Sequence, residues 1–184
     1  ERNPNYFRDD RAFADQVELL CIQDTSARMN ALMSGDVQAI DEVDLKTIEL
    51  IKSQPGITID RVKSSLHYTF PMRTDIAPFD NLDVRLALKY AIDRDDLLQK
   101  ILYGYGVVGN DSPIGPSYRY WDKDIPQHSY DPDKAKFHLK KAGQENLRID
   151  LSTAEAAFVG ATDAAVLFAE HARRAGIEIN VVRE

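Results

Sequence analysis

The chain has 184 residues, of which 43% are hydrophobic and 29% are charged, and its formal net charge is −7. This length and composition fit one or two small globular domains and exclude an intrinsically disordered chain. The acidic balance, without a basic stripe, argues against a nucleic-acid partner, and no apolar run approaches the roughly 18 residues that a membrane span needs.

The first 72 residues predict strands that alternate with short helices. Four stretches have the apolar run or the alternating pattern of a strand or an extended segment: residues 16–23, 37–43, 57–62 and 66–72. Two capped helices are expected between them, at residues 26–34 and 45–53. Asp24 and Asp44 are placed to cap these helices, and Gly35 suits the end of the first one.

From residue 73 onward the pattern becomes mainly helical. Helices are predicted at residues 84–92, 94–103, 131–143 and 162–175, and strands at residues 147–152 and 177–182. Asp93 and Asp131 are the expected caps of the second and third of these helices, and Pro132 occupies a first helical turn. Residues 106–129 form a long predicted loop, rich in Gly, Pro, Tyr and Trp.

The residue patterns predict no catalytic residue, no metal site and no cofactor. The four histidines, two of which (His138 and His171) are expected on surface helices, lack the spacing that places two ligands on one helical face. Adjacent acidic residues tend to diverge, and a nucleophile elbow of the Gly-x-Ser-x-Gly type is missing. Cys21, the single cysteine, follows Leu19 and Leu20 and is expected in a core.

Five short segments together resemble one known family. In chain order they are NPNYF at residues 3–7, DTSAR with LMSGDV at residues 24–37, PFDNLDVRLALKYAIDR at residues 78–94, YDPDKAK at residues 130–136 and AGIEI at residues 175–179. They resemble the extracellular solute-binding proteins of family 5, which include oligopeptide, dipeptide and nickel importers. Phe7 departs from the Trp of that pattern. The segments build capped, packed helices and so indicate a fold rather than a chemical site.

The resemblance implies an α/β fold of the periplasmic-binding-protein-like type II class (cluster C), with mixed sheets and flanking helices. It implies that residues 1–72 are the later part of a first lobe and that residues 73–184 are the first, truncated part of a second lobe. The chain is then expected to be an internal fragment of a longer protein, with an inter-lobe hinge near residues 68–74.

The function implied by the resemblance is that of the solute-binding component of an ABC importer. Two lobes would close on a small solute, with a peptide as the leading candidate, and a membrane permease would recognise the closed form. Such a protein is not an enzyme and is periplasmic or extracellular, in some cases through a lipid anchor. The alternative is a solute-sensing receptor module for a signalling partner. The oligomeric state stays open.

Five residues are the candidate ligand contacts. Tyr68, Phe70 and Arg73 lie at the expected hinge, and Glu155 and Phe158 lie in the loop after the strand at residues 147–152. Ligand sites of α/β sheets gather at such strand ends, and a following helix N-terminus attracts carboxylates. Three aromatic residues of the long loop have two interpretations, a cover over the core or direct contact with the solute: Tyr118, Tyr120 and Trp121.

Overall fold

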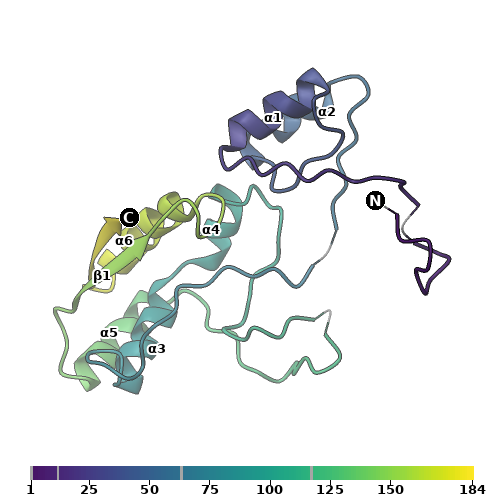
Figure 1. Ribbon diagram of the computed structural model, residues 1–184. Helices are drawn as coiled ribbons and strands as arrows, with labels where there is room; N and C mark the ends of the chain where they lie inside the picture. Colours follow the sequence, from purple (N-terminus) through teal and green to yellow (C-terminus); the bar gives the residue numbers. More distant parts are fainter. Residues whose placement is uncertain (1, 12, 63, 117) are drawn as a thin grey trace. The chain divides into compact units, whose positions relative to one another are not determined.

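A computed structural model describes residues 2–11, 13–62, 64–116 and 118–184 of the chain. Its contacts divide into two compact units, Glu1–Asp44 and Leu45–Glu184. The elements, in chain order, are α1 (Thr25–Ser34), the 3₁₀ turn η1 (Leu45–Thr47), α2 (Ile48–Lys52), α3 (Leu82–Ala91), α4 (Arg94–Lys100), α5 (Pro132–Lys141), β1 (Arg148–Thr153), α6 (Ala161–Arg173) and β2 (Glu178–Arg183) (Figure 1). The prediction of an α/β fold is confirmed.

The predicted helices all form, because each carries its own start and stop signals. The side chain of Asp24 accepts a hydrogen bond from the Ala27 N–H at 2.7 Å, and Gly35 ends α1 at a left-handed φ of 82°. Helix α3 begins at Leu82, two residues earlier than expected, because the side chain of Asn81 caps it. Thr47 takes the cap position of α2 that was expected for Asp44, since η1 precedes that helix.

The same arginine contact secures the start of α1 and the start of α3. Arg28 and Arg85 each lie four residues after the helix cap. The Nη1 of Arg28 donates to the carbonyls of residues 22 and 23 at 2.7 and 3.0 Å. The Nη1 of Arg85 donates to the carbonyls of residues 79 and 80 at 2.7 and 3.1 Å. Each guanidinium therefore fixes the direction in which the chain enters the helix.

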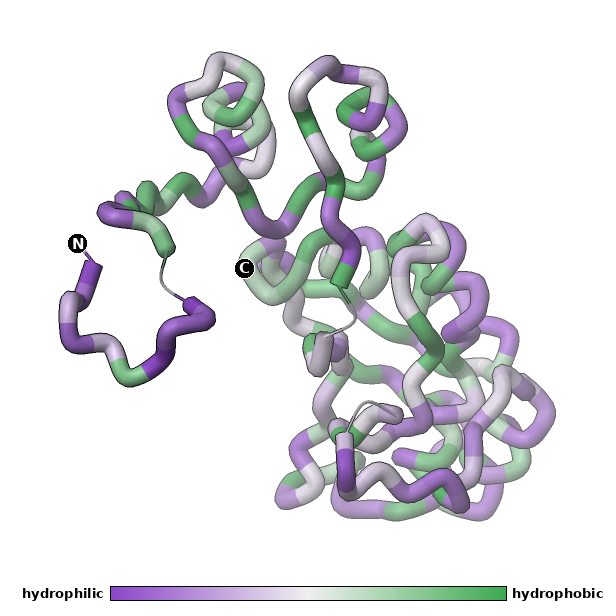
Figure 2. The backbone as a smooth tube through the Cα atoms, turned by 90° about the vertical axis from the view of Figure 1, so that its right-hand side faces the viewer, coloured by the Kyte–Doolittle hydropathy of each residue, from purple (hydrophilic) through white to green (hydrophobic). Residues whose placement is uncertain are grey.

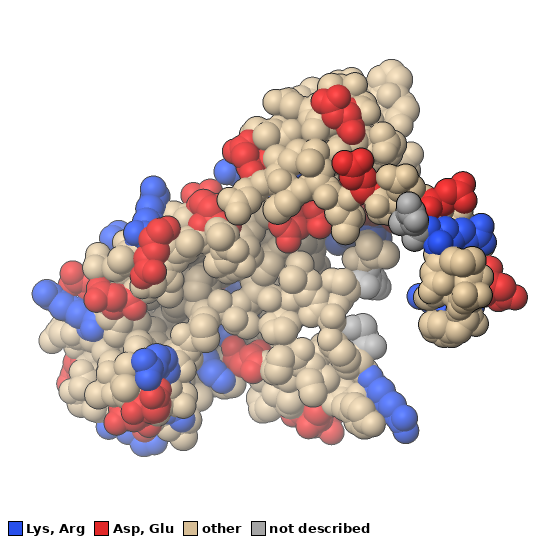
Figure 3. Space-filling view, in the orientation of Figure 1, with Lys and Arg blue, Asp and Glu red and all other residues tan. Residues whose placement is uncertain are grey.

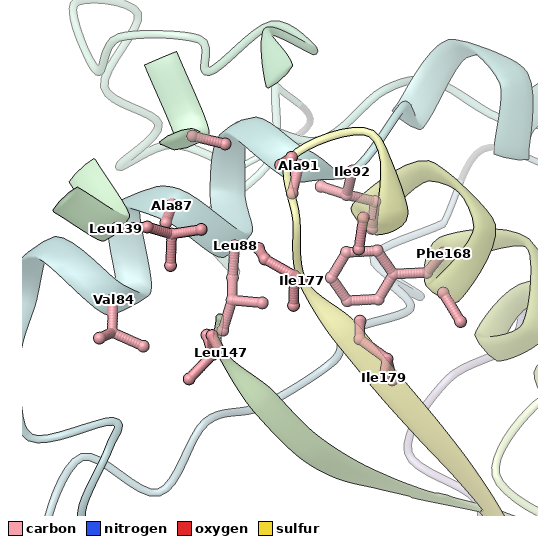
Figure 4. Close-up of a cluster of buried hydrophobic side chains, with 14 residues drawn as sticks. Val84, Ala87, Leu88, Ala91, Ile92, Leu139, Leu147, Phe168, Ile177 and Ile179 are labelled. Atoms are coloured by element: carbon pink, nitrogen blue, oxygen red, sulfur yellow. The ribbon is translucent and has the colours of Figure 1, made fainter. Parts of the chain in front are cut away.

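An α/β unit holds the main core. Strands β1 and β2 pair in parallel from Arg148↔Glu178 to Thr153↔Arg183, and α6 connects them. Helix α3 packs against α5 and α6 and presents the predicted apolar stripe, in which every member is buried: Val84, Ala87, Leu88 and Ala91. Figure 4 shows these side chains meeting Leu139 of α5, Phe168 of α6 and Ile177 and Ile179 near the second strand.

The prediction for His171 was wrong, because this residue is buried at 7% exposure instead of lying on a surface. Its Nδ1 accepts from the backbone N–H of Asp93 at 3.3 Å, and its Nε2 lies 2.9 Å from Asp96 Oδ2. A neutral ring that carries its proton on Nε2 satisfies both contacts. The Tyr130 hydroxyl donates to the carbonyl of His171 at 3.1 Å, so α6, α4 and the start of α5 meet here.

Asp111 fastens the long loop to the helices. Its carboxylate pairs with Arg94 and lies 2.8 Å from His128 Nδ1 and 3.8 Å from Lys89 Nζ. The Nη1 of Arg94 also donates to the carbonyls of Lys89 and His128, at 3.1 and 2.9 Å. On the face seen in Figure 3, acidic and basic side chains are interspersed, as these short-range pairs require.

The strands predicted at residues 16–23, 37–43 and 57–62 were wrong. Within the described residues, only β1 and β2 form a sheet, and these earlier segments have no strand to pair with. Leu19 is 91% exposed, Cys21 is exposed rather than buried, and Figure 2 draws a hydrophobic stretch near the N-terminus. A strand needs a neighbour for its ladder and a layer for its apolar face, so the alternating pattern alone does not produce one.

The aromatic residues of the long loop do not cover the core. Tyr118, Tyr120 and Trp121 are all exposed. The first of their two interpretations is therefore wrong for the described chain, because the core is closed by α3, α5 and α6 instead.

Leu139→Ala is expected to lower the free energy of unfolding by about 2–5 kcal/mol, because it leaves a cavity in the core. Phe137→Ala on the same helix is the matched control and should change it by less than about 0.5 kcal/mol. The two side chains are 1% and 63% exposed. Urea unfolding monitored by circular dichroism measures both, and equal effects would contradict the described core.

Asp96→Asn is expected to reduce stability at neutral pH and to lose that effect in acid. Hydrogen bonds from Lys100 and then His171 hold the pKa of Asp96 below its usual range. A carboxyl group whose folded-state pKa is lowered stabilises the fold above its unfolded pKa, about 4, and loses this contribution as the pH falls through the folded value.

Urea unfolding at pH 7, 5 and 3 tests this expectation. The difference between the original protein and Asp96→Asn should shrink between pH 5 and pH 3. Asp95→Asn, at the exposed neighbouring position, is the control and should show no such trend. A difference that is the same at all three pH values would contradict the prediction.

Candidate functional site

Three of the five predicted site residues come together in a group of aromatic rings. The rings of Tyr68 and Phe158 stack with their centroids 4.3 Å apart and their planes 14° from parallel. Phe70 meets Phe158 edge-on at 6.3 Å. We refer to these three residues as the aromatic platform. Residues 68–70 and the loop before α6 are far apart in sequence, so tertiary folding creates this platform.

The platform extends from the core to the surface. Phe168 of α6 is buried, and its ring lies 5.4 Å from that of Phe70. Phe70 and Phe158 are half-buried, and Tyr68 is 40% exposed. A surface that is rigid at its buried end and accessible at its outer end suits contact with the apolar part of a small solute.

The loop between β1 and α6 fixes the position of Phe158. The N–H of Ala161 donates to the carbonyl of Phe158 at 3.0 Å, which places the ring directly before the first turn of α6. Gly160 caps the helix at a φ of 80°, and a Cβ at this position would lie 2.9 Å from Cγ2 of Ile101. Glycine therefore permits both the left-handed turn and the close approach of the segment that follows α4.

Arg73 and Glu155 are accessible but lie apart from this stacking. Arg73 pairs with Asp75 through two nitrogens, at 2.7 and 3.3 Å, and this hydrogen bonding holds the pKa of Asp75 below its usual range. The two side chains are 71% and 64% exposed, so water screens the pair. Glu155 is exposed in the loop that carries Phe158.

Sequence reasoning did not find a second aromatic contact, at Tyr105. Its hydroxyl lies 3.2 Å from Lys52 Nζ, and the guanidinium carbon of Arg61 lies 5.0 Å from the ring centroid. Hydrogen bonds with Glu49 and then with Tyr105 raise the pKa of Lys52. Tyr105 falls between the helix predicted at residues 94–103 and the loop predicted at residues 106–129, and neither pattern indicates the two cations.

Three of the four histidines are paired with separate aspartates rather than grouped, and the fourth, His67, lies 3.1 Å from the carbonyl of Ser65. His128 pairs with Asp111, His138 with Asp83 and His171 with Asp96. In the part of the chain that the structure describes, no three His, Cys, Asp or Glu side chains are arranged to hold a metal ion. None of the helices described there is long and apolar enough to span a membrane.

The N-terminal residues line an open surface cavity of about 410 Å³. Its lining includes Arg2, Tyr6 and Arg8, and Arg8 is paired with Asp10 at 2.8 Å. None of the five predicted ligand contacts lines it, and its walls are largely polar side chains on irregular backbone. We therefore place the candidate site at the aromatic platform.

The whole chain, residues 1–184, matches the family described as bacterial extracellular solute-binding proteins, family 5 (middle region). It belongs to this family. The resemblance carried by the five short segments is thereby confirmed, and so is the periplasmic-binding-protein-like fold class.

Relatives and a solved structure agree with this assignment. Heme-binding protein A of Haemophilus influenzae is 28% identical over 77% of this chain and 26% of its own length. The oligopeptide-binding protein AppA of Bacillus subtilis is 28% identical over 97% of this chain and 35% of its own length. The ABC transporter-associated periplasmic binding protein DppA of Helicobacter pylori, in complex with the peptide STSA, superposes with a TM-score of 0.72 at 26% identity, covering 89% of this chain and 31% of its own.

The chain therefore spans about a quarter to a third of the length of the proteins that it matches.

Phe70→Ala is expected to lower the free energy of unfolding by about 2 kcal/mol, because the half-buried ring links the platform to Phe168. Arg73→Ala should change it by less than about 0.5 kcal/mol, since its ion pair is exposed. Thermal unfolding of both variants measures the contrast. A larger loss for Arg73→Ala would contradict the contacts described for the two residues.

Proposed function

We propose that this chain is an internal part of a two-lobed protein that binds a peptide and delivers it to an ABC importer. The observation that carries the proposal is the partly exposed Tyr68–Phe158 stack, at the loop that follows β1, in a chain that matches family 5 over its full length. Residues 1–72 belong to the first lobe and residues 73–184 to the second, with the platform near the change from one to the other.

The chemistry around the platform supports a peptide as the solute. Aromatic faces accept apolar side chains without demanding one sequence. The guanidinium of Arg73 is held only by an exposed ion pair, so it can exchange Asp75 for a peptide carboxylate, which it binds in the same forked geometry. Glu155 offers the opposite charge for an amino terminus. The relatives AppA and DppA are both described with peptides.

The mechanism follows from binding between lobes. A solute that contacts residues of both lobes at once binds the closed arrangement better than the open one, and it shifts the population by that difference in affinity. The permease then recognises the closed arrangement. The protein acts in the periplasm or outside the cell, where a lipid anchor is one means of retention, and it binds its solute without chemical conversion.

A thermal-shift screen of the full-length protein tests the proposed solute. Pools of di- and oligopeptides, oligosaccharides, nickel chelates and heme are compared. A peptide at a hundred times its Kd should stabilise the protein by about 2.7 kcal/mol. Stabilisation by a non-peptide pool alone would overturn the choice of solute. Neighbouring genes for a sensor kinase, in place of permease and ATPase genes, would favour a solute-sensing receptor instead.

Phe158→Ala is expected to weaken binding of the identified peptide by about tenfold or more, because it removes half of the stacked pair. Phe137→Ala on α5 is the matched control, since it removes an equal ring at an exposed position outside the platform. Isothermal titration calorimetry measures the Kd of each. The proposal fails for this site if both variants bind as the original protein does.

A further inference from the structure

Tyr105 lies between two cations that belong to an earlier part of the chain. Lys52 at the end of α2 contacts its hydroxyl at 3.2 Å, and its Nζ lies 5.9 Å from the ring centroid. The guanidinium carbon of Arg61 lies 5.0 Å from the same centroid. The ring therefore receives one hydrogen bond, from Lys52, and one cation–π contact, from Arg61, and both come from residues 52–61.

The backbone conformation around Tyr105 determines where this ring lies. Tyr103 and Gly104 are successive left-handed residues, with φ values of 49° and 77°. A positive φ is uncommon for tyrosine, and such conformations persist where the surrounding structure enforces them. The N–H of Gly104 donates to the carbonyl of Leu98 at 2.9 Å, and that of Tyr105 donates to the carbonyl of Leu102 at 2.6 Å. The turn after α4 is thus fixed by its own hydrogen bonds.

The turn that carries Tyr105 adjoins the loop of the aromatic platform. Ile101 lies against Gly160, two residues from Phe158. The segment that ends in Tyr105 therefore contacts residues 52–61 through its ring and, through Ile101, the loop that holds Phe158.

We propose that Tyr105 is a positioning residue for the aromatic platform: its contacts with Lys52 and Arg61, called the clamp, tie residues 52–61 to the turn after α4, whose Ile101 packs at Gly160 in the loop that carries Phe158. The proposal rests on the proposed function, because it assigns to Tyr105 control over the geometry of that same ligand site.

An exposed ion pair supports the clamp at a second point. Lys46 in η1 lies 3.4 Å from Asp163 in the first turn of α6, and both side chains are about 60% exposed. Such a pair contributes little by itself. The clamp at Tyr105 adds a hydrogen bond and a cation–π contact between residues 52–61 and the turn after α4.

The experiment uses full-length protein with spin labels at Leu50→Cys on α2 and Lys140→Cys on α5, in a Cys21→Ser background. Both labelled positions are exposed. Pulsed electron resonance measures the distance distribution without ligand, and calorimetry measures the Kd of the peptide found in the screen. Tyr105→Leu should broaden the distribution and weaken binding about five- to tenfold, through loss of the hydrogen bond with Lys52 and the cation–π contact with Arg61.

Tyr105→Phe keeps the ring for Arg61 and loses only the hydroxyl, so it should weaken binding about twofold and broaden the distribution less. A purely structural role for the ring would change the melting temperature and leave the distances and the Kd unchanged, which would overturn the proposal. Phe137→Leu is the control for loss of an exposed ring, and an equal effect there would also overturn it.

Two further outcomes are decided by the same design. Should Tyr105→Leu fail to fold, Tyr105→Phe and Arg61→Gln each remove one contact of the clamp, and unchanged distances in both would refute it. Should no solute bind to the original protein, the proposed function fails, while the distance distributions of the ligand-free variants still show whether the clamp exists.

Discussion

The α/β unit depends on one contact, the packing of the apolar stripe of α3 against α5 and α6. Ala87 and Ala91 are fully buried and allow the neighbouring helices to approach closely, while Val84 and Leu88 fill the space beside them. The remaining parts are placed by this contact. Helix α4 leaves α3 at a fixed corner, and the strands lie beyond α6, which connects them.

Polar pairs then specify how these helices are aligned. His138 lies 2.8 Å from Asp83 and joins α5 to the start of α3, while His171 and Asp96 join α6 to α4. The four side chains are 9–27% exposed, so each pair is mostly buried, and a shift of one helix would break its hydrogen bond. Phe168 lies in the same core, so it connects the aromatic platform to these aligned helices.

The platform joins the fold to its proposed role. Its inner end is part of the core, and its outer end, at Tyr68, is accessible to a solute. The short segments that resemble family 5 lie mainly in capped helices, away from these rings, so they identify the family through its framework rather than through its ligand contacts. This division explains why relatives of one fold are named for heme and for oligopeptides.

The helices were determined by the sequence alone, because caps such as Asp24, Asn81 and Asp131 and the stripe of α3 act within a few residues. Only the tertiary structure decided which segments are strands, because strand pairing needs a partner that is distant in sequence. Residues 148–153 pair with such a partner, and residues 16–23 do not. The tertiary structure also decided the site. Sequence reasoning named Tyr68, Phe70 and Phe158 but could not show that their rings meet, nor that Lys52 and Arg61 enclose Tyr105, because such contacts join residues far apart in the chain.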